Sequence, residues 1–318
     1  MPETKTTSKV AIVGAGSVGA TIAYACLIRG VGKQIALFDV NRAKVDAEVL
    51  DLNHGLQFVP MASVEGSDDV GIAADSDIVV ITAGAKQKPG QTRMDLAAAN
   101  ANICRKLVPQ LLSVAPNAVF LLVTNPVDVI TYVTQKLTGL PPPRVLGSGT
   151  VLDSSRFRYL IAERCRVAVQ NVHAHIVGEH GDSEIPLWSS ATIANIPLHE
   201  WAVKGHGKLT VRDRSEIFEN VKTAAQQIIQ GKGATNYAIG LSTAKILEAL
   251  LHDENRILPV SSLLKDYQGV DDVCLSVPSI VNRGGVEQAL PIKMNEAELA
   301  GLKNSAEQIR EAIRAVGF

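Results

Sequence analysis

Several features are scarce in this sequence, and each scarcity excludes a class of protein. Aromatic residues make up only 4% of the 318 residues, which removes the stacking platforms of proteins that bind single-stranded nucleic acids. The 31 Lys and Arg residues nearly cancel the 32 Asp and Glu residues, so the basic surplus of a nucleic-acid binder is missing. No apolar run approaches the roughly 18 residues that a membrane-spanning helix needs. We therefore expect neither a nucleic-acid partner nor a membrane.

Cysteine is also scarce, and its spacing is uninformative for a disulfide or a metal site. Cys26, Cys104, Cys165 and Cys274 are widely separated and form no CxxC pair. A disulfide framework and a thiolate zinc site are therefore disfavoured, and a reducing compartment is expected. The polar residues 1–9 lead directly into a strand-like run, so we expect no signal peptide. Apolar residues at 46% and charged residues at 20% complete the expectation of a globular cytoplasmic protein.

The first half of the chain alternates short apolar runs with longer helical patterns. The predicted strands are Val10–Val13, Ile35–Phe38, Ile78–Ile81, Ala118–Val123 and Val145–Leu146. The predicted helices between them are Ser17–Arg29, Arg42–Asn53 and Asp95–Ser113. Continuously apolar strands separated by helices indicate a parallel sheet that is covered on both faces. The fold class is therefore predicted to be α/β, with a doubly wound Rossmann sheet.

The rhythm changes after about Gly147. A helix is predicted over Leu152–Arg164 and a strand over His173–Val177, and long helices return near 211–230 and 234–251. Apolar residues stepping by three and four from Leu299 to Val316 predict a final amphipathic helix. We expect two units, a nucleotide-binding domain over 1–148 and a C-terminal α+β substrate domain over 149–318.

A glycine-rich turn follows the first predicted strand. Gly14, Gly16 and Gly19 form a GxGxxG pattern between the strand that ends at Val13 and the next helix. The first glycine allows a tight turn, the second lets a pyrophosphate approach the backbone, and the third lets the helix pack closely. Asp39 ends the second strand, where a carboxylate accepts hydrogen bonds from ribose hydroxyls and repels a 2′-phosphate. The pattern therefore favours NAD over NADP.

A histidine in a glycine-flanked loop is the candidate for acid–base chemistry. His180 lies just past a predicted strand end, and Asp153 and Arg156, three residues apart, share one face of a predicted helix. A carboxylate there can orient the imidazole, and a guanidinium can grip a substrate carboxylate. An ordinary surface histidine is one alternative. A metal site with His173 and His175 is another, although the spacing defines no complete ligand set.

Five segments of the chain, together with Asp39, resemble the motif set of the bacterial L-lactate dehydrogenases, in the lactate/malate dehydrogenase family. The segments are Gly14–Gly19, Ala85–Arg93, Val123–Asp128, Leu152–Arg158 and Gly178–Asp182, with Asp39. They stand in family order and extend nearly from end to end. The resemblance implies a two-domain, normally tetrameric cytoplasmic enzyme that interconverts pyruvate and L-lactate with NAD at the end of glycolysis.

The resemblance also implies roles for individual residues. His180 matches the proton donor and acceptor, Asp153 its carboxylate partner, and Arg156 the residue that binds the substrate carboxylate. Arg93 matches the arginine that closes over the substrate and polarises its carbonyl. The positions implied for substrate binding are Gln87, Arg93, Asn125, Arg156 and Thr235. The positions implied for NAD are Gly14, Gly16, Val18, Gly19, Asp39, Lys44, Ala83, Gly84, Asn125 and Ser148. No metal is expected.

Gln87 bears on which acid is the substrate. In the related malate dehydrogenases an arginine matches this position and pairs with a second carboxylate. The neutral Gln87 would leave the extra charge of oxaloacetate uncompensated, at a cost of several kcal/mol. A malate or other 2-hydroxy-acid dehydrogenase is the nearest alternative. A non-catalytic NAD-binding module is another, but such a protein has no need of His180, Asp153, Arg156 and Arg93 together.

Two further positions match an effector site of the regulated bacterial enzymes. Arg158 lies two residues after Arg156, about 200° round a helix, so the two point in different directions. His173 lies well before His180 in the sequence. Arg158 and His173 match the residues that bind fructose 1,6-bisphosphate at an interface of the homotetramer, which predicts activation by this effector. The alternative is that both are plain surface or interface residues.

Overall fold

A nine-stranded sheet runs through the protein in the computed structural model, which describes residues 8–85, 93–203 and 207–318. The strands lie in the order β16-β15-β14-β6-β5-β4-β1-β2-β3. The parallel strands are β1 (Lys9–Val13), β2 (Gln34–Phe38), β3 (Ser63–Ser67), β4 (Ile78–Ile81), β5 (Val119–Leu122) and β6 (Val145–Gly147). The antiparallel strands are β14 (Arg256–Leu264), β15 (Val273–Asn282) and β16 (Gly285–Ala289).

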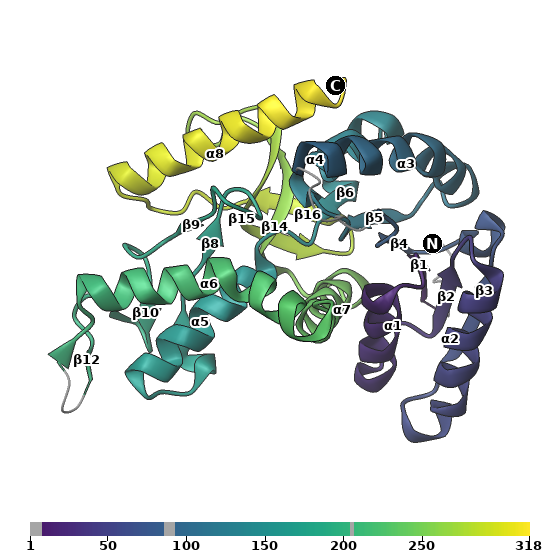
Figure 1. Ribbon diagram of the computed structural model, residues 1–318, viewed down its shortest axis with the longest axis horizontal. Coiled ribbons are helices and arrows are strands. Elements are labelled where there is room, and N and C mark those ends of the chain that lie inside the picture. Colours follow the sequence, from purple (N-terminus) through teal and green to yellow (C-terminus); the bar gives the residue numbers. More distant parts are fainter. Residues whose placement is uncertain (1–7, 86–92, 204–206) are drawn as a thin grey trace, which may run out of the picture.

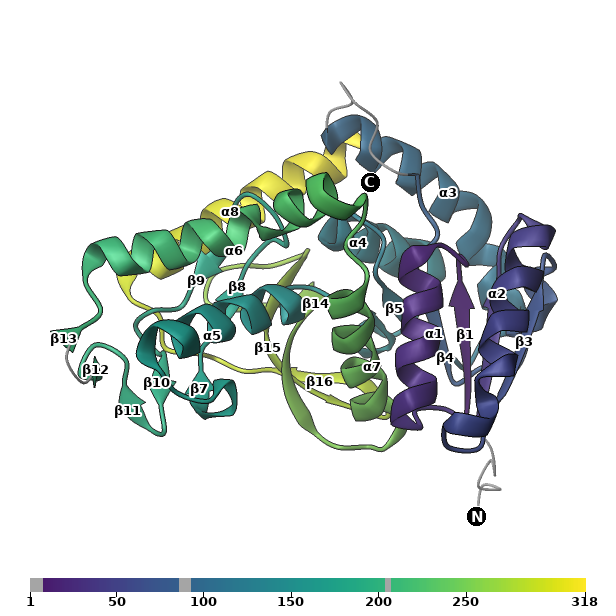
Figure 2. The same ribbon diagram turned by 60° about the horizontal axis from the view of Figure 1, so that its bottom comes forward.

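Helices cover both faces of this sheet (Figures 1 and 2). They are α1 (Ser17–Arg29), α2 (Arg42–His54), α3 (Arg93–Val114), α4 (Val127–Thr138), α5 (Val151–Cys165), α6 (Val211–Lys232), α7 (Tyr237–Leu251) and α8 (Glu296–Ala315). Short 3₁₀ turns occur at Leu56–Phe58, Val70–Ala73, Pro142–Arg144 and Val169–Asn171. Helices α3, α4 and α8 pack on one face, and α1 and α7 lie side by side on the other.

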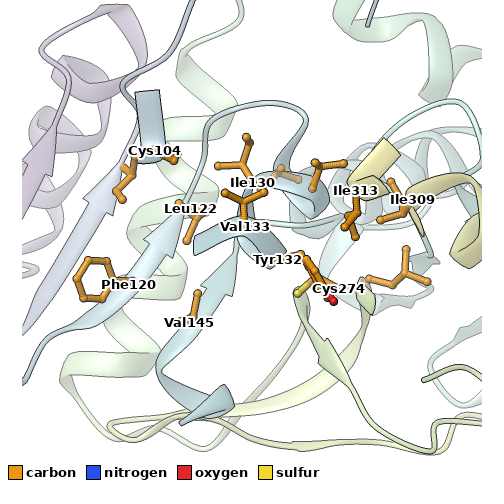
Figure 3. Packing of buried hydrophobic residues seen from close by; sticks show 14 of the residues in the cluster. Cys104, Phe120, Leu122, Ile130, Tyr132, Val133, Val145, Cys274, Ile309 and Ile313 are labelled. Atoms are coloured by element: carbon orange, nitrogen blue, oxygen red, sulfur yellow. The ribbon is translucent and has the colours of Figure 1, made fainter. Parts of the chain in front are cut away.

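The parallel strands inside the sheet are almost continuously apolar because both of their faces are buried; they are β1, β2, β4, β5 and β6. In β1, Val10 and Ile12 pack on the α1 and α7 side, whereas Ala11 and Val13 pack on the α3 and α4 side. Figure 3 shows the second of these cores, where Leu122 of β5 lies beside Ile130 and Val133 of α4. Continuously apolar strands are what a doubly covered parallel sheet requires.

A separate core holds the region at the far end of the molecule from α1 and α2 (Figure 1). It joins α5 and α6 to short strands through buried residues that include Phe157, Ile176 and Ile217. The short strands are β7 (Val172–His173), β8 (Ile176–Val177), β9 (Ile185–Pro186), β10 (Thr192–Ile193), β11 (Ile196–Pro197), β12 (Ala202–Val203) and β13 (Gly207–Lys208). This region carries the histidine loop, because β8 leads directly into it.

The predicted fold class is confirmed, with one wrong element and several that the sequence did not indicate. The strand predicted over His173–Val177 is two strands, because β7 pairs with β10 whereas β8 pairs with β9. Helix α4 and the strands β3 and β14–β16 were not predicted. The expected boundary at 148/149 falls between β6 and α5, and β14 from the second half hydrogen-bonds to β6.

Candidate active site

The positions expected to bind NAD lie at one edge of the parallel sheet. Most of them follow the carboxyl end of a strand: Gly14 and Gly16 after β1, Asp39 after β2, Ala83 and Gly84 after β4, Asn125 after β5, and Ser148 after β6. Val18 and Gly19 lie in the first turn of α1, and Lys44 lies in the first turn of α2. Because these strands are parallel and neighbours, their carboxyl ends meet at the same edge. In open α/β sheets that edge is where nucleotides bind.

The glycine loop leaves room where a pyrophosphate needs it. Gly14 has a φ of +107°, and a Cβ there would lie 2.8 Å from the backbone nitrogen of Ala83. A Cβ at Gly19 would lie 1.9 Å from the carbonyl oxygen of Gly14, so a side chain would separate helix from strand. A Cβ at Gly16 would meet nothing within 4 Å except Lys44 Nζ at 3.9 Å. Gly16 therefore exposes its backbone beside a cation, which suits a phosphate group.

Asp39 is held against this loop by the main chain. Its Oδ2 accepts a hydrogen bond from the Ala15 N–H at 2.9 Å, and its Oδ1 accepts one from the Asn41 N–H at 3.0 Å. Each oxygen keeps a further lone pair that can accept a ribose hydroxyl. Val18 lies half-buried in the first turn of α1, and Ser148 is buried. These residues fit the adenosine and pyrophosphate parts of NAD.

The structure describes some of the residues expected in the substrate pocket and leaves others out. Asn125 is exposed between β5 and α4, and its carbonyl oxygen accepts a hydrogen bond from Asn100 Nδ2 at 2.7 Å. Thr235 is half-buried in the link between α6 and α7. Arg93 is the first residue of α3. Gln87 and the side chain of Arg93 lie outside the described part of the chain.

The candidate proton donor forms a chain of contacts with two residues of α5. His180 Nδ1 lies 2.5 Å from Asp153 Oδ2, and Asp153 Oδ1 accepts a hydrogen bond from Arg156 Nη1 at 2.8 Å. A carboxylate only accepts hydrogen bonds, so the proton between His180 and Asp153 resides on Nδ1. The other ring nitrogen, Nε2, is left for a substrate. The spacing of Asp153 and Arg156 on one helix face produces this arrangement.

The charges of this cluster support a protonated imidazole. Burial lowers the pKa of His180, but the charge and hydrogen bond of Asp153, with the nearby Asp128 and Glu184, raise this pKa to about 9. Burial raises the pKa of Asp153, but His180 and Arg156 outweigh it and hold the pKa below its ordinary value. The histidine is therefore cationic at neutral pH, as a group that donates a proton to a carbonyl oxygen must be.

The loop that carries His180 is fixed at three consecutive residues. Gly178 exchanges two backbone hydrogen bonds with Ser276 of β15, at 2.8 and 3.0 Å. The Glu179 N–H donates to Ser305 Oγ of α8 at 2.7 Å. The His180 N–H donates to Asp128 Oδ2 of α4 at 2.8 Å. The position of the catalytic loop is thus set by three elements that are distant from it in the sequence.

Two buried carboxyl groups beside His180 were not singled out from the sequence. Asp128 is 1% exposed, and the one signal for it is a charged residue near the start of an otherwise apolar segment. Glu184 is 7% exposed, and its Oε1 has no hydrogen-bond partner among the described residues. Burial and the charge of Asp153 raise the pKa of Glu184 to about 8. Glu184 is therefore mostly neutral at pH 7.

The residues expected to bind an effector, Arg158 and His173, lie in a second cluster together with His175. Arg158 Nε donates to the carbonyl oxygen of Ala174 at 2.7 Å, and its Nη2 lies 3.2 Å from His175 Nδ1. His173 is exposed on β7. Burial, Arg158 and His173 together lower the pKa of His175 to about 3. His175 is therefore neutral and accepts the hydrogen bond from Arg158.

The metal alternative finds no support in the described residues, where no three His, Cys, Asp or Glu side chains gather as a ligand set. His175 Nδ1 is already occupied by Arg158. In the same described ranges, no helix is both long and apolar enough to cross a membrane.

Family models and known proteins match nearly the whole chain. Residues 8–147 match the model for the lactate/malate dehydrogenase NAD binding domain, and residues 150–317 match the model for the α/β C-terminal domain. The chain belongs to the lactate/malate dehydrogenase family. Membership establishes NAD as the cofactor and the protein as an NAD-dependent enzyme of this family.

Individual relatives agree in sequence and in structure. The chain is 55% identical to an L-lactate dehydrogenase from Bifidobacterium animalis subsp. lactis, over 98% of both chains. It is 46% identical to an L-lactate dehydrogenase from Acetivibrio thermocellus, over 99% of both. Among solved structures, the minor L-lactate dehydrogenase of Enterococcus mundtii is 40% identical, with a TM-score of 0.94 over 98% of this chain and 99% of that one. A lactate dehydrogenase from a Medee basin deep-sea metagenome library is 39% identical, with the same TM-score and the same coverage of both chains.

Proposed function

We propose that the protein is an L-lactate dehydrogenase, which reversibly reduces pyruvate to L-lactate with NADH at the end of glycolysis or fermentation. The contact chain from His180 through Asp153 to Arg156 carries this proposal, because it supplies a proton donor and a carboxylate-binding cation side by side. The names of the relatives with 55% and 46% identity support the same activity.

The residues divide the chemistry between them. When bound, NADH supplies the hydride that reaches the carbonyl carbon of pyruvate. His180 donates the Nε2 proton to the carbonyl oxygen, while Asp153 fixes the ring and stabilises its charged form. Arg156 uses one nitrogen on Asp153 and keeps further N–H groups for the substrate carboxylate. Family resemblance assigns polarisation of the carbonyl to Arg93 and the lining of the pocket to Asn125 and Thr235.

Gln87 supports pyruvate as the substrate over oxaloacetate. A neutral side chain at this position offers no charge partner to the second carboxylate of a dianion. The test is to follow NADH absorbance with pyruvate and with oxaloacetate under the same conditions. We expect kcat/KM for pyruvate to exceed that for oxaloacetate by about 100-fold, the factor that a few kcal/mol produces. A preference for oxaloacetate would identify a malate dehydrogenase instead.

We also propose that fructose 1,6-bisphosphate activates the enzyme by binding near Arg158 and His173. The cationic cluster supports this, because no ion pair joins Arg158 to a carboxylate in the described part of the chain. The guanidinium is held by Ala174 and His175 and retains N–H groups that can bind a phosphate. Two phosphate groups at an interface would offset the repulsion between paired cations and favour the assembled state.

A homotetramer is part of the same proposal. Exposed apolar side chains on α1 and α7, which lie side by side, support an interface there (Figure 2). They are Tyr24, Ile28, Tyr237 and Leu241. Large apolar side chains that are exposed on two adjacent helices are candidates for burial against another subunit. Light scattering of the purified protein tests the assembly. The cytoplasmic location remains a prediction from the sequence.

A further inference from the structure

Asp128 is a fully enclosed carboxylate in the first turn of α4. Its neighbours Val127, Val129 and Ile130 are buried apolar residues, and Asp128 is 1% exposed. An unpaired carboxylate in such surroundings costs several kcal/mol. Both oxygens of Asp128 are hydrogen-bonded: Oδ1 accepts from Ser261 Oγ at 2.6 Å, and Oδ2 accepts from the His180 N–H at 2.8 Å.

These two contacts join the histidine loop to the centre of the sheet. Ser261 lies on β14, opposite Gly147 of β6, at the point where the antiparallel strands meet the parallel ones. Ser261 is completely buried. Asp128 therefore ties the main chain at His180 to the most enclosed part of the sheet rather than to a surface loop.

The charge of Asp128 also acts on the histidine. Burial raises the pKa of Asp128 to about 6, against the lowering effect of the hydrogen bonds from Ser261 and His180, so the group is mostly ionised at neutral pH. Its other titratable neighbours are Glu179 on the loop and Cys274 on β15.

The imidazole is faced by charged and titratable groups from three elements. They are Asp153 and Arg156 on α5, Asp128 on α4, and Glu184 on the loop. Of these three carboxyl groups, Asp153 is the one that contacts the ring, at Nδ1. Asp128 contributes its negative charge while holding the backbone of the same residue.

We propose that Asp128 is a positioning residue for the proton donor, one that fixes the main chain at His180 to β14 and supplies a second negative charge to stabilise the imidazolium. The inference rests on the proposed role of His180 as the proton donor to pyruvate. Asp128 itself touches neither substrate nor cofactor in this proposal.

Asp128→Asn tests the negative charge of Asp128 separately from its hydrogen bonds. Its amide oxygen can still accept the His180 N–H and its amide nitrogen can donate to Ser261 Oγ, whereas the negative charge is lost. In saturating NADH, kcat/KM for pyruvate falls as pH rises through the pKa of His180. We expect the midpoint of that fall to move down by about one pH unit in Asp128→Asn, the effect of removing one partly buried neighbouring charge.

Two controls distinguish this effect from lost stability and from a wrong function. Asp213→Asn removes another buried carboxylate, which caps α6 and pairs with Arg164. We expect it to lower the melting temperature and leave the pH midpoint in place. If the wild-type protein does not reduce pyruvate with NADH, the proposed function fails. If the wild type shows the alkaline fall and folded Asp128→Asn shows it at the same pH, this inference alone is overturned.

Ser261 provides a second route should Asp128→Asn fail to fold. Ser261→Ala removes the bond to Oδ1 and frees the carboxylate to shift, so kcat should fall about 3- to 10-fold, the range of one hydrogen bond. KM for NADH should not change, and Ser261→Thr should restore kcat because it returns the hydroxyl. A wild-type kcat in Ser261→Ala, or no restoration by Ser261→Thr, would overturn the proposal.

Discussion

His175 and His180 lie five residues apart on one segment, and their pKa values are shifted in opposite directions. Burial lowers the pKa of both rings. For His180 the neighbouring Asp153 reverses the effect and raises the pKa to about 9. For His175 the neighbouring Arg158 and His173 add to the effect of burial, and the pKa falls to about 3. The sign of the neighbouring charge therefore decides whether the effect of burial on the pKa is reversed, as at His180, or reinforced, as at His175.

Helix α5 supplies the charged neighbour in both cases. Asp153 and Arg156 serve the cluster at His180, where negative and positive groups compensate each other. Arg158 serves the cluster at His175, where the described neighbours are cations or neutral groups. The first cluster contains charges of both signs, and no carboxylate among the described residues forms an ion pair with Arg158 in the second. An anion is what completes the second cluster, which is the physical basis for the proposed effector.

Removal of the charged imidazole should produce the largest effect. His180→Asn loses the proton donor, so turnover of pyruvate should fall by about 10²- to 10⁴-fold, while NADH binding is kept. Steady-state rates and NADH fluorescence measure the two quantities. His199→Asn, at an exposed histidine paired with Glu200, is the matched control and should turn over normally. Near-normal rates in His180→Asn would end the assignment of His180 as proton donor.

The second-largest effect is expected at Arg156, the cation of the first cluster. Arg156→Gln should raise KM for pyruvate by about 10²- to 10³-fold, because a charged hydrogen-bonded pair with the substrate carboxylate is lost. Removal of the guanidinium also leaves Asp153 with one partner instead of two. Arg212→Gln, at an exposed arginine paired with Glu216, is the control. An unchanged KM in Arg156→Gln would show that the substrate carboxylate binds elsewhere.

The comparison of the clusters also shows what a sequence can predict. The ends of α1 and β4 lie where the sequence places them, because glycine positions and short apolar runs mark them locally. Strand β3, with the sequence SVEGS, has no apolar run, since it lies at the sheet edge. Helix α4 is rich in β-branched residues, and its burial against α3 and α8 overrides that preference.

In the candidate site too, some contacts are predictable from the local sequence and others depend on the tertiary fold. The contact between Asp153 and Arg156 is implicit in a spacing of three on a helix. The contacts of Asp128 with Ser261 and His180 span 133 and 52 residues, and no local pattern encodes such separations. The pairing of β14 with β6 and the hydrogen bonds between Gly178 and Ser276 of β15 bring these three residues together.

A smaller effect is expected at the second cluster. In the wild type, we expect fructose 1,6-bisphosphate to raise the affinity for pyruvate by about 5- to 150-fold. Arg158→Gln removes the guanidinium of this cluster, so the activation should be lost in the variant. Pyruvate saturation curves with and without the effector measure it in both proteins. Activation that survives in Arg158→Gln would place the effector elsewhere. Superimposable wild-type curves would show that the cation cluster has no such ligand.

The smallest effect is expected at Glu184, the buried acid of the first cluster with an unpaired oxygen. Its pKa is about 8 in the folded protein, raised from 4.5 by burial and by Asp153. The folded state therefore keeps a proton that the unfolded state releases, so this group makes the free energy of unfolding fall as pH rises from about 4.5 to 8.

Glu184→Gln abolishes that dependence of stability on pH. The variant should melt a few degrees above wild type at pH 8 and close to it at pH 5, whereas Glu200→Gln, at an exposed residue, should show no such difference. Equal melting temperatures for wild type and Glu184→Gln at pH 8 would mean that Glu184 ionises at an ordinary pH. The conclusion that Glu184 is neutral beside Asp153 would then be wrong.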